Sequence, residues 1–173
     1  MNNNYIGRTK NGLKVYNRKR SHIHKEGGLS RELLREALRK IEFPEEEEFK
    51  KYELNLKRPI GETTCVQTFE NDKVVAVYRL GRQGTTPMVL GRSPEKCSWI
   101  TVILKKFQDD SYGPKLIVVT AFIGAGSKPE PWDRNLKTKA EREEAKKFWD
   151  QHALVFNPDL VDWERTPTSL EHL

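Results

Sequence analysis

The sequence predicts an α+β fold, in which an N-terminal helix packs on a curved, mostly antiparallel sheet of about four to five strands, followed by a C-terminal helix. Three observations lead to this prediction. Apolar residues recur at helical spacing near residues 30–41 and again near 138–153. Between Glu62 and Ala121 the chain is instead rich in Val, Ile, Thr and aromatic residues. No helix-length segment separates these stretches, so we expect sequential, antiparallel strands.

The first elements are a short strand within residues 13–19 and a helix that begins after Ser30. Ser30 is a suitable N-cap because its hydroxyl can accept a hydrogen bond from an unpaired backbone N–H of the first turn. Pro44 ends the helix. The apolar stripe of this helix consists of Leu33, Leu34, Ala37, Leu38 and Ile41.

The later elements are expected to be four strands and a second helix. The strands are the segments "TCVQTFE", "KVVAVYRL", "WITVILKKF" and "KLIVVTAFI". The second helix runs to about Ala153, and Thr138 and Glu141 at its start have the spacing of a capping box. Residues 1–12 and 157–173 are expected at the periphery. The prediction is therefore a single domain covering residues 1–173.

The chain is basic, with a formal net charge of +6 and a sequence pI near 9.3. This balance suits a polyanionic partner such as RNA, DNA or an anionic membrane, but it also fits a protein with many surface lysines. Cys65 and Cys97 have neither the number nor the spacing of a disulfide framework or a zinc site. The sequence has no apolar run of about 18 residues and no signal peptide, so we expect no membrane contact and a cytoplasmic location.

Two histidines stand close together in "RSHIHKEGGLS". In an extended segment His22 and His24 lie on the same face. An imidazole, whose unperturbed pKa is about 6.5, both accepts and donates protons near neutrality. Lys19 and Arg20 just upstream would hold a phosphate beside them. Three roles remain open for these histidines: proton transfer or phosphate contact, a surface position without function, and metal binding, for which a further ligand would be needed.

Further candidates stand later in the chain. Arg79 and Arg82 in "YRLGRQG" and Arg92 in "LGRSP" suit bidentate phosphate binding, or they belong to a solvated loop between strands. The hydroxyl of Thr120 in "LIVVTAF", and that of Thr101 in "WITVIL", must find a partner in an apolar strand. That partner is either a backbone carbonyl or a ligand. His152 is expected on the second helix, partly buried.

This order of histidine, basic segment, amphipathic helix and strands that end in "VVTAF" resembles the barnase–EndoU–colicin–RelE-like (BECR) superfamily of small RNases and toxin domains. The resemblance covers residues 13–125 and matches Thr120–Ala121 to the threonine–alanine pair on a late strand of that family. The histidines here precede the first helix, however, and "GAGSKPEPWD" with the second helix extends beyond the minimal fold. The string "VVTAFIGAGSKPEPWD" is also similar to a group of uncharacterised bacterial proteins.

The resemblance implies a metal-independent endoribonuclease or toxin-type nuclease that needs no cofactor. In that chemistry the RNA 2′-OH attacks the adjacent phosphate, with one of His22 and His24 as base and the other, or His152, as acid. RNA is the expected partner, with an inhibitor or immunity protein as a second. The remaining roles are charge stabilisation by Arg79 and Arg82, orientation by Thr120, and substrate binding by Lys19, Arg20, Arg92 and Thr101. The alternative is a non-catalytic domain that binds nucleic acid or protein.

Overall fold

The computed structural model describes residues 4–19, 21–109 and 113–167. The chain divides into two compact units. Unit 1 consists of Met1–Thr63 and Lys96–Gly126, and unit 2 of Thr64–Glu95 and Ser127–Leu173. That residues 1–173 behave as one domain stays a prediction for unfolding experiments.

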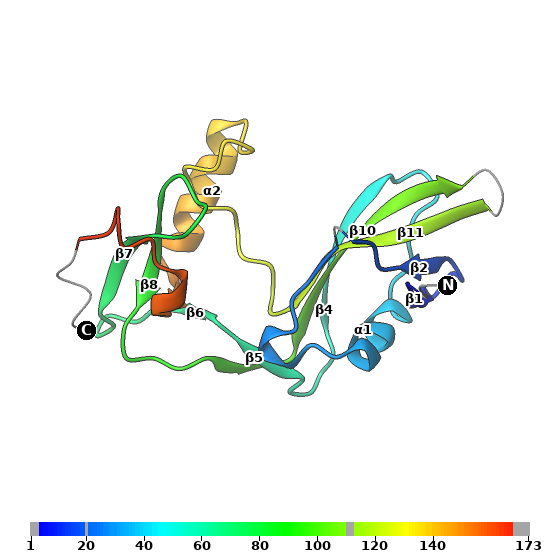
Figure 1. Cartoon of the computed structure of the whole chain (residues 1–173), viewed down its shortest axis with the longest axis horizontal. Helices are drawn as coiled ribbons and strands as arrows, with labels where there is room; N and C mark the ends of the chain where they lie inside the picture. Colours follow the sequence, from blue (N-terminus) through cyan, green and yellow to red (C-terminus); the bar gives the residue numbers. More distant parts are fainter. Residues whose placement is uncertain (1–3, 20, 110–112, 168–173) are drawn as a thin grey trace. The chain divides into compact units, whose positions relative to one another are not determined.

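Unit 1 contains a mixed six-stranded sheet with the order β1-β2-β11-β10-β4, whose strands are labelled in Figure 1, and with β3 also paired to β11. The two long strands β10 and β11 are antiparallel neighbours at its centre, and β2 and β3 both run parallel to β11. The strand bounds are β1 Tyr5–Arg8, β2 Lys14–Tyr16, β3 His22–Ile23, β4 Phe49–Asn55, β10 Trp99–Asp109 and β11 Gly113–Ile123.

Helix α1 (Arg31–Leu38) covers one face of this sheet. Ser30 caps it as predicted, since its side chain accepts a hydrogen bond from the N–H of Leu33. The whole predicted stripe from Leu33 to Ile41 is buried against alternate residues of the central strands. A short 3₁₀ helix, η1 (Glu26–Gly28), precedes α1. At Gly27 the φ angle is +76°, and a Cβ would lie 2.3 Å from the carbonyl oxygen of Glu62, so this close approach requires glycine.

Unit 2 contains a four-stranded sheet with the order β6-β12-β8-β7. Its strands are β6 Cys65–Gln67, β7 Val74–Tyr78, β8 Thr85–Val89 and β12 His152–Val155. Helix α2 (Lys139–Trp149) begins with the predicted capping box of Thr138 and Glu141. The remaining elements are the two-stranded sheet of β5 (Gly61–Thr63) and β9 (Glu95–Cys97) and the 3₁₀ helix η2 (Pro158–Leu160). Neither described α-helix has the length and apolar character that crossing a bilayer requires.

The predicted fold class is wrong. The described residues are mostly sheet, with 39% in strands and 15% in helices, and their strands form several sheets rather than one curved sheet beneath an N-terminal helix. The physical reason lies in the pairing partners. The strand expected at "KVVAVYRL" is β7, and it pairs with β8, which is not among the four predicted strands. β8 in turn pairs with β12, which follows the second helix in the chain.

Candidate nucleic-acid interface

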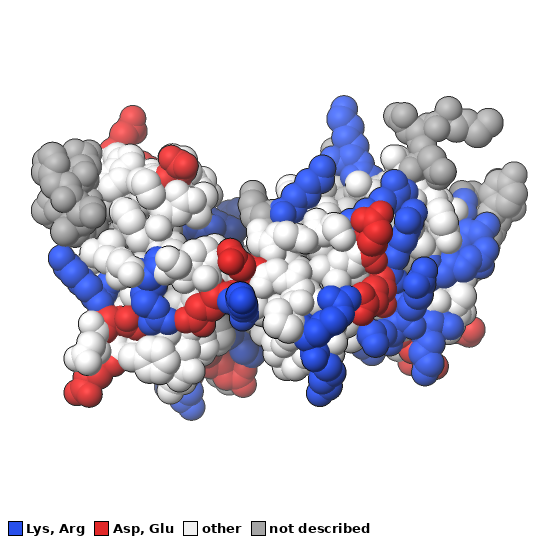
Figure 2. All heavy atoms as spheres, turned by 90° about the horizontal axis from the view of Figure 1, so that it is seen from below, with Lys and Arg blue, Asp and Glu red and all other residues white. Residues whose placement is uncertain are grey.

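The positive charge of the chain belongs to unit 1. Unit 1 has 19 Lys and Arg against 12 Asp and Glu, whereas unit 2 has 12 against 13. Figure 2 shows one face on which Lys and Arg gather over unit 1, at the right, and mix with Asp and Glu over unit 2. A polyanionic partner would therefore be attracted to unit 1.

The face of the six-stranded sheet opposite α1, here called the open face, holds most of the aromatic side chains of unit 1. Because side chains alternate along a strand, residues between the buried positions of β10 point to this face. The register of the neighbouring strands extends the face from β4 to β1. Its aromatic residues are Tyr5, Tyr16, Phe49, Trp99, Phe107 and Phe122.

Cations are interleaved with these rings. Lys105 lies between Phe49 and Ile117 in the ladder, and Lys115 lies opposite Phe107. Lys51 stands two residues along β4 from Phe49, and its Nζ pairs with Glu53 Oε1 on the same face at 2.6 Å. Phe49 is 52% exposed and Trp99 is 38% exposed, which is high for such large apolar groups. Flat apolar surfaces beside positive charge are therefore available to a ligand here.

One hollow of about 170 Å³ on the open face combines both features. Its lining includes Tyr16, Phe107 and Ile117 together with Arg18 and Lys115. The Arg18 guanidinium carbon lies 3.8 Å from the centre of the Phe107 ring, and the Lys115 Nζ lies 5.8 Å from that of Tyr16. These cation–π contacts hold the positive charges beside the apolar floor of the hollow.

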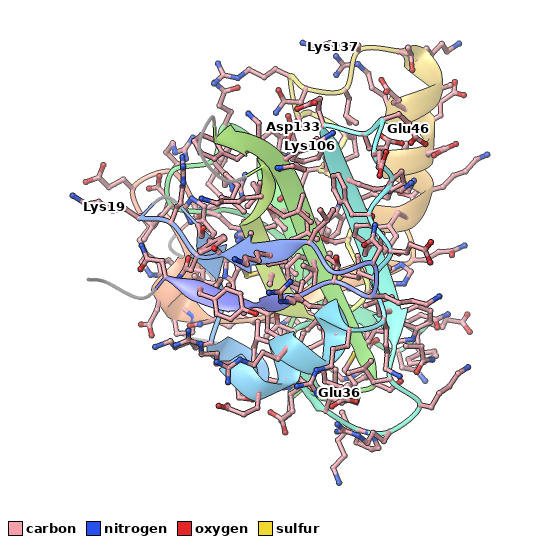
Figure 3. All side chains as sticks on the ribbon, turned by 90° about the vertical axis from the view of Figure 1, so that its right-hand side faces the viewer. Lys19, Glu36, Glu46, Lys106, Asp133 and Lys137 are labelled. Carbon is pink, nitrogen blue, oxygen red and sulfur yellow. The ribbon has the colours of Figure 1, made fainter. Side chains whose placement is uncertain are left out.

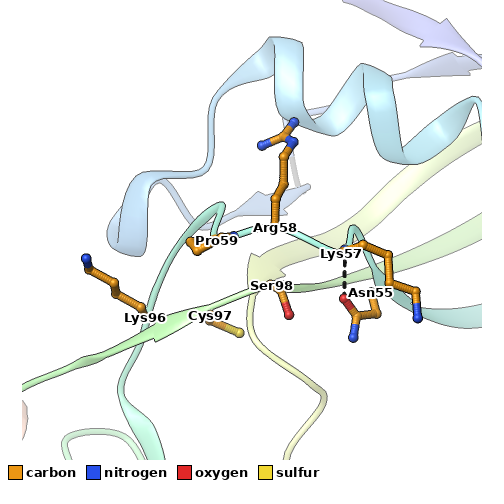
Figure 4. Close-up of a pocket in the computed structure, with 7 residues that line it drawn as sticks. All are labelled: Asn55, Lys57, Arg58, Pro59, Lys96, Cys97 and Ser98. Carbon is orange, nitrogen blue, oxygen red and sulfur yellow. Dashed lines mark hydrogen bonds between the residues drawn. The ribbon is translucent and has the colours of Figure 1, made fainter.

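A second basic hollow, of about 340 Å³, lies where β4 ends and β10 begins (Figure 4). Lys96 and Lys57 stand at its two ends with Ser98 between them. Arg58 turns away toward α1, where it pairs with Glu36. Lys57 has a φ of +60°, uncommon for a residue with a side chain, and its N–H donates to Asn55 Oδ1 at 2.8 Å.

The two predicted histidines of unit 1 lie at the open face. His22 in β3 is the register partner of Thr120 in β11, whose Oγ1 donates to the His22 carbonyl oxygen at 2.8 Å. The His24 ring meets the Phe122 ring edge to face, with 6.2 Å between their centres. Both histidine side chains are exposed. The structure therefore brings His22, His24 and Thr120 together, with the Thr120 hydroxyl already bonded to the backbone.

Four predicted site residues lie in unit 2 instead. Arg79 Nη1 is 3.4 Å from Oε1 of the buried Glu130, and burial lowers the pKa of Arg79. The carbonyl oxygen of Arg82 accepts a hydrogen bond from Arg165. Arg92 forms ion pairs with Asp72 and Glu95.

His152 begins strand β12, and its expected position on the second helix is wrong. Its ring stacks on Phe148 at 4.1 Å, and Nδ1 donates to the Phe148 carbonyl oxygen at 2.9 Å. Within unit 2 these are contacts that stabilise the fold.

The other predicted substrate-binding residues belong to unit 1. Lys19 extends away from the ribbon (Figure 3). Arg20 lies outside the described residues. Thr101 is fully buried, and its hydroxyl donates to the Gly124 carbonyl oxygen at 2.8 Å. Of the two partners considered for Thr101, the structure supplies the backbone carbonyl.

Sequence reasoning missed the aromatic residues of the open face. A usable signal was present, because alternate positions from Trp99 to Phe107 hold Trp, Thr, Ile, Lys and Phe on the side away from the core. Among the described residues, no group of three or more His, Cys, Asp and Glu side chains could hold a metal ion. Comparison with known protein families, with curated proteins and with solved structures found no match for the chain.

Proposed function

We propose that unit 1 binds single-stranded nucleic acid, RNA foremost, on its open face. The observation that carries the proposal is the interleaving of six aromatic side chains with Lys105, Lys115 and Arg18 on this face. Bases stack on aromatic rings whatever their sequence, while the cations attract the phosphates between them. The net positive charge of unit 1 supports the same partner.

Single strands fit this face better than a duplex does. The ring faces accept a base only when that base is unstacked from its neighbours, and the bases of a duplex are not. A duplex would meet this face with phosphates alone and would leave Phe49 and Trp99 in contact with water. Single-stranded RNA is therefore the expected ligand.

The test is fluorescence anisotropy of a labelled oligonucleotide of about 12 nucleotides with the full chain. Phe49→Ala and Trp99→Ala remove exposed rings, so both variants should fold normally. Since stacking contributes about 1–3 kcal/mol per base, each change should weaken binding by roughly 5- to 150-fold. A labelled duplex of equal length should bind more weakly than the single strand.

The matched controls are Phe69→Ala and Leu80→Ala, which remove side chains that are each 63% exposed in unit 2. They should leave the affinity unchanged. Equal losses in the unit 2 and open-face variants, or tighter binding of the duplex, would overturn the proposal.

A second candidate function is cleavage of the bound RNA, favoured by the shared position of His22, His24 and Thr120. One histidine would take the 2′-OH proton while the 2′-oxygen forms a bond to phosphorus. The bond from phosphorus to the 5′-oxygen would break, and the other histidine would protonate that oxygen. This leaves a 2′,3′-cyclic phosphate and needs no metal. The Arg79 and Arg82 contribution expected from the sequence has no support within unit 1.

Cleavage is tested by incubating the chain with RNA in EDTA and analysing the ends of the products. Cyclic phosphate ends that disappear in both His22→Ala and His24→Ala would support it. RNA that is bound but stays intact would refute cleavage and leave binding as the only function. Products that persist in both variants would show that other groups, or a contaminant, cut the RNA.

A further inference from the structure

A hollow lined by four cations lies beyond the open face, between β1 and α1. This β1–α1 hollow has a volume of about 500 Å³. It is formed by the segment from Tyr5 to Lys10 and by two arginines of the helix and its C-terminus. Four of its lining residues are cationic and none is acidic: Arg8, Lys10, Arg35 and Arg39.

Two of these cations are held in place by the backbone. Arg35 Nε donates to the carbonyl oxygen of Ile6 at 2.6 Å, and Arg8 Nη1 donates to that of Gly12 at 3.1 Å. Each guanidinium has five N–H donors, so one bond to a carbonyl leaves others for a phosphate. The arginines are therefore ordered before a ligand arrives, which lowers the entropy cost of binding.

The other two cations are more accessible. Arg39 is exposed and has no side-chain hydrogen bond or ion pair with the described part of the chain. Lys10 pairs with Glu42 at 3.2 Å, but both side chains are about two-thirds exposed. An ion pair this exposed is weak and exchanges readily for a phosphate.

Tyr5 connects this hollow to the open face. Its ring packs against Tyr16 with 5.6 Å between centres, on the open face, while the residue also lines the β1–α1 hollow. β1 is the edge strand of the sheet, and in Figure 3 it crosses in front with α1 beneath it. A chain that follows the open face past Tyr5 thus reaches the hollow by passing over a single strand.

We propose that a nucleic-acid strand bound on the open face continues over β1 and places its phosphates in the β1–α1 hollow. This rests on the proposed function and extends it, since it defines where the backbone of a longer strand runs. The hollow has cations but, Tyr5 apart, no aromatic lining residue. It therefore recognises phosphodiester groups and is indifferent to base sequence.

Oligonucleotide length separates the two surfaces. A strand of about 4 nucleotides can occupy the open face alone, whereas one of about 12 can also reach the hollow. The double variant Lys10→Gln/Arg39→Gln should leave the affinity for the short strand unchanged. For the long strand it should lower the affinity and reduce the slope of log Kd against log salt by about 1.4, or roughly 0.7 for each phosphate that the protein no longer neutralises.

The matched control is Lys139→Gln/Lys147→Gln, which removes the same charge from exposed positions of α2. It should change neither affinity nor slope for either strand. Equal effects of the two double variants, or an unchanged slope with the long strand, would overturn the path over β1. In that case losses in Phe49→Ala and Trp99→Ala would still support the open face. If neither the short nor the long oligonucleotide binds, both the open-face proposal and the path over β1 are overturned.

Discussion

Replacing Glu130 with Ala should destabilise unit 2 by about 3 kcal/mol. Glu130 is 6% exposed, and its Oε1 accepts a hydrogen bond from the Thr86 hydroxyl at 2.9 Å. The same oxygen lies 3.4 Å from Arg79 Nη1. The substitution therefore leaves a fully buried hydroxyl without its acceptor and a largely buried guanidinium without its counter-ion.

The magnitude follows from these two losses. Removing one partner of a fully buried ion pair costs about 3–5 kcal/mol, and an unsatisfied buried hydroxyl about 1–3 kcal/mol. The Arg79 side chain keeps 23% exposure and the pair is long, so water recovers part of the first cost. Glu130→Gln keeps an oxygen for Thr86 and loses only the charge, so it should cost less, about 1–2 kcal/mol.

Urea unfolding of the full chain, followed by tryptophan fluorescence, measures this directly. Three of the four tryptophans lie in unit 2, and Trp132 Nε1 donates to the Thr85 carbonyl oxygen next to Thr86. The control is Glu164→Ala, an exposed carboxylate of the same unit. The reasoning is refuted if Glu130→Ala unfolds within about 0.5 kcal/mol of this control. Affinity for nucleic acid should not change, because Arg79 lies outside unit 1.

Two other predictions concern the core and the cysteines. Leu34→Asp and Val118→Asp should each abolish the cooperative thermal transition that circular dichroism follows, because both positions are 1% exposed and the carboxylate would have no partner. A normal melting curve would contradict the placement of these residues in the core. Burial raises the pKa of Cys65 from 9.0 to about 11. In Cys97→Ser the alkylation of Cys65 at pH 8 should be roughly 90-fold slower than that of an exposed thiol with a pKa of 9.0, and a comparable rate would contradict this. Since the unfolded thiol ionises first, stability should fall as pH rises from 9 to 11 in urea titrations.

Local signals located the starts of the two helices and the central strands well, whereas both helices end earlier than expected, at Leu38 and Trp149. Ser30 and the Thr138–Glu141 box mark helix starts through bonds made within one turn, so neighbouring residues contain the needed information. The long strands β10 and β11 are similarly confirmed at "WITVILKKF" and "KLIVVTAFI". In each case the element is defined by residues close together in the chain.

The end of the second helix shows why other elements were missed. Ala153 stands four residues after Trp149, so helical periodicity continues past the point where the helix ends. The chain instead turns at Asp150–Gln151 and enters β12, whose pairing with β8 spans more than sixty residues. Pro87 within β8 also lowers strand propensity, although proline is tolerated where its position needs no N–H in the ladder.

The sequence predicted only part of the candidate site, because long-range strand pairing decides which residues meet. His22, His24 and Thr120 share a face because β3 pairs with β11. Strict alternation from the buried Val118 would place Thr120 on the core side, and the register irregularity between β10 and β11 at this point turns it to the open face. Arg79 and Arg82 follow β7, which belongs to the other unit. The partition of strands between two units depends on pairing across long stretches of chain. The boundary between Thr63 and Thr64 has no glycine- or proline-rich linker, whereas the one between Gly126 and Ser127 lies within the segment "GAGSKPEPWD".

The most direct test of the central claim is ultraviolet cross-linking of a bound single-stranded oligonucleotide, followed by mass spectrometry of the adduct peptides. Aromatic side chains stacked on bases are placed to form such adducts. Adducts are expected in peptides that contain Phe49, Trp99 or Phe107 of the open face. Adducts confined to residues 64–95 and 127–173 would contradict that claim.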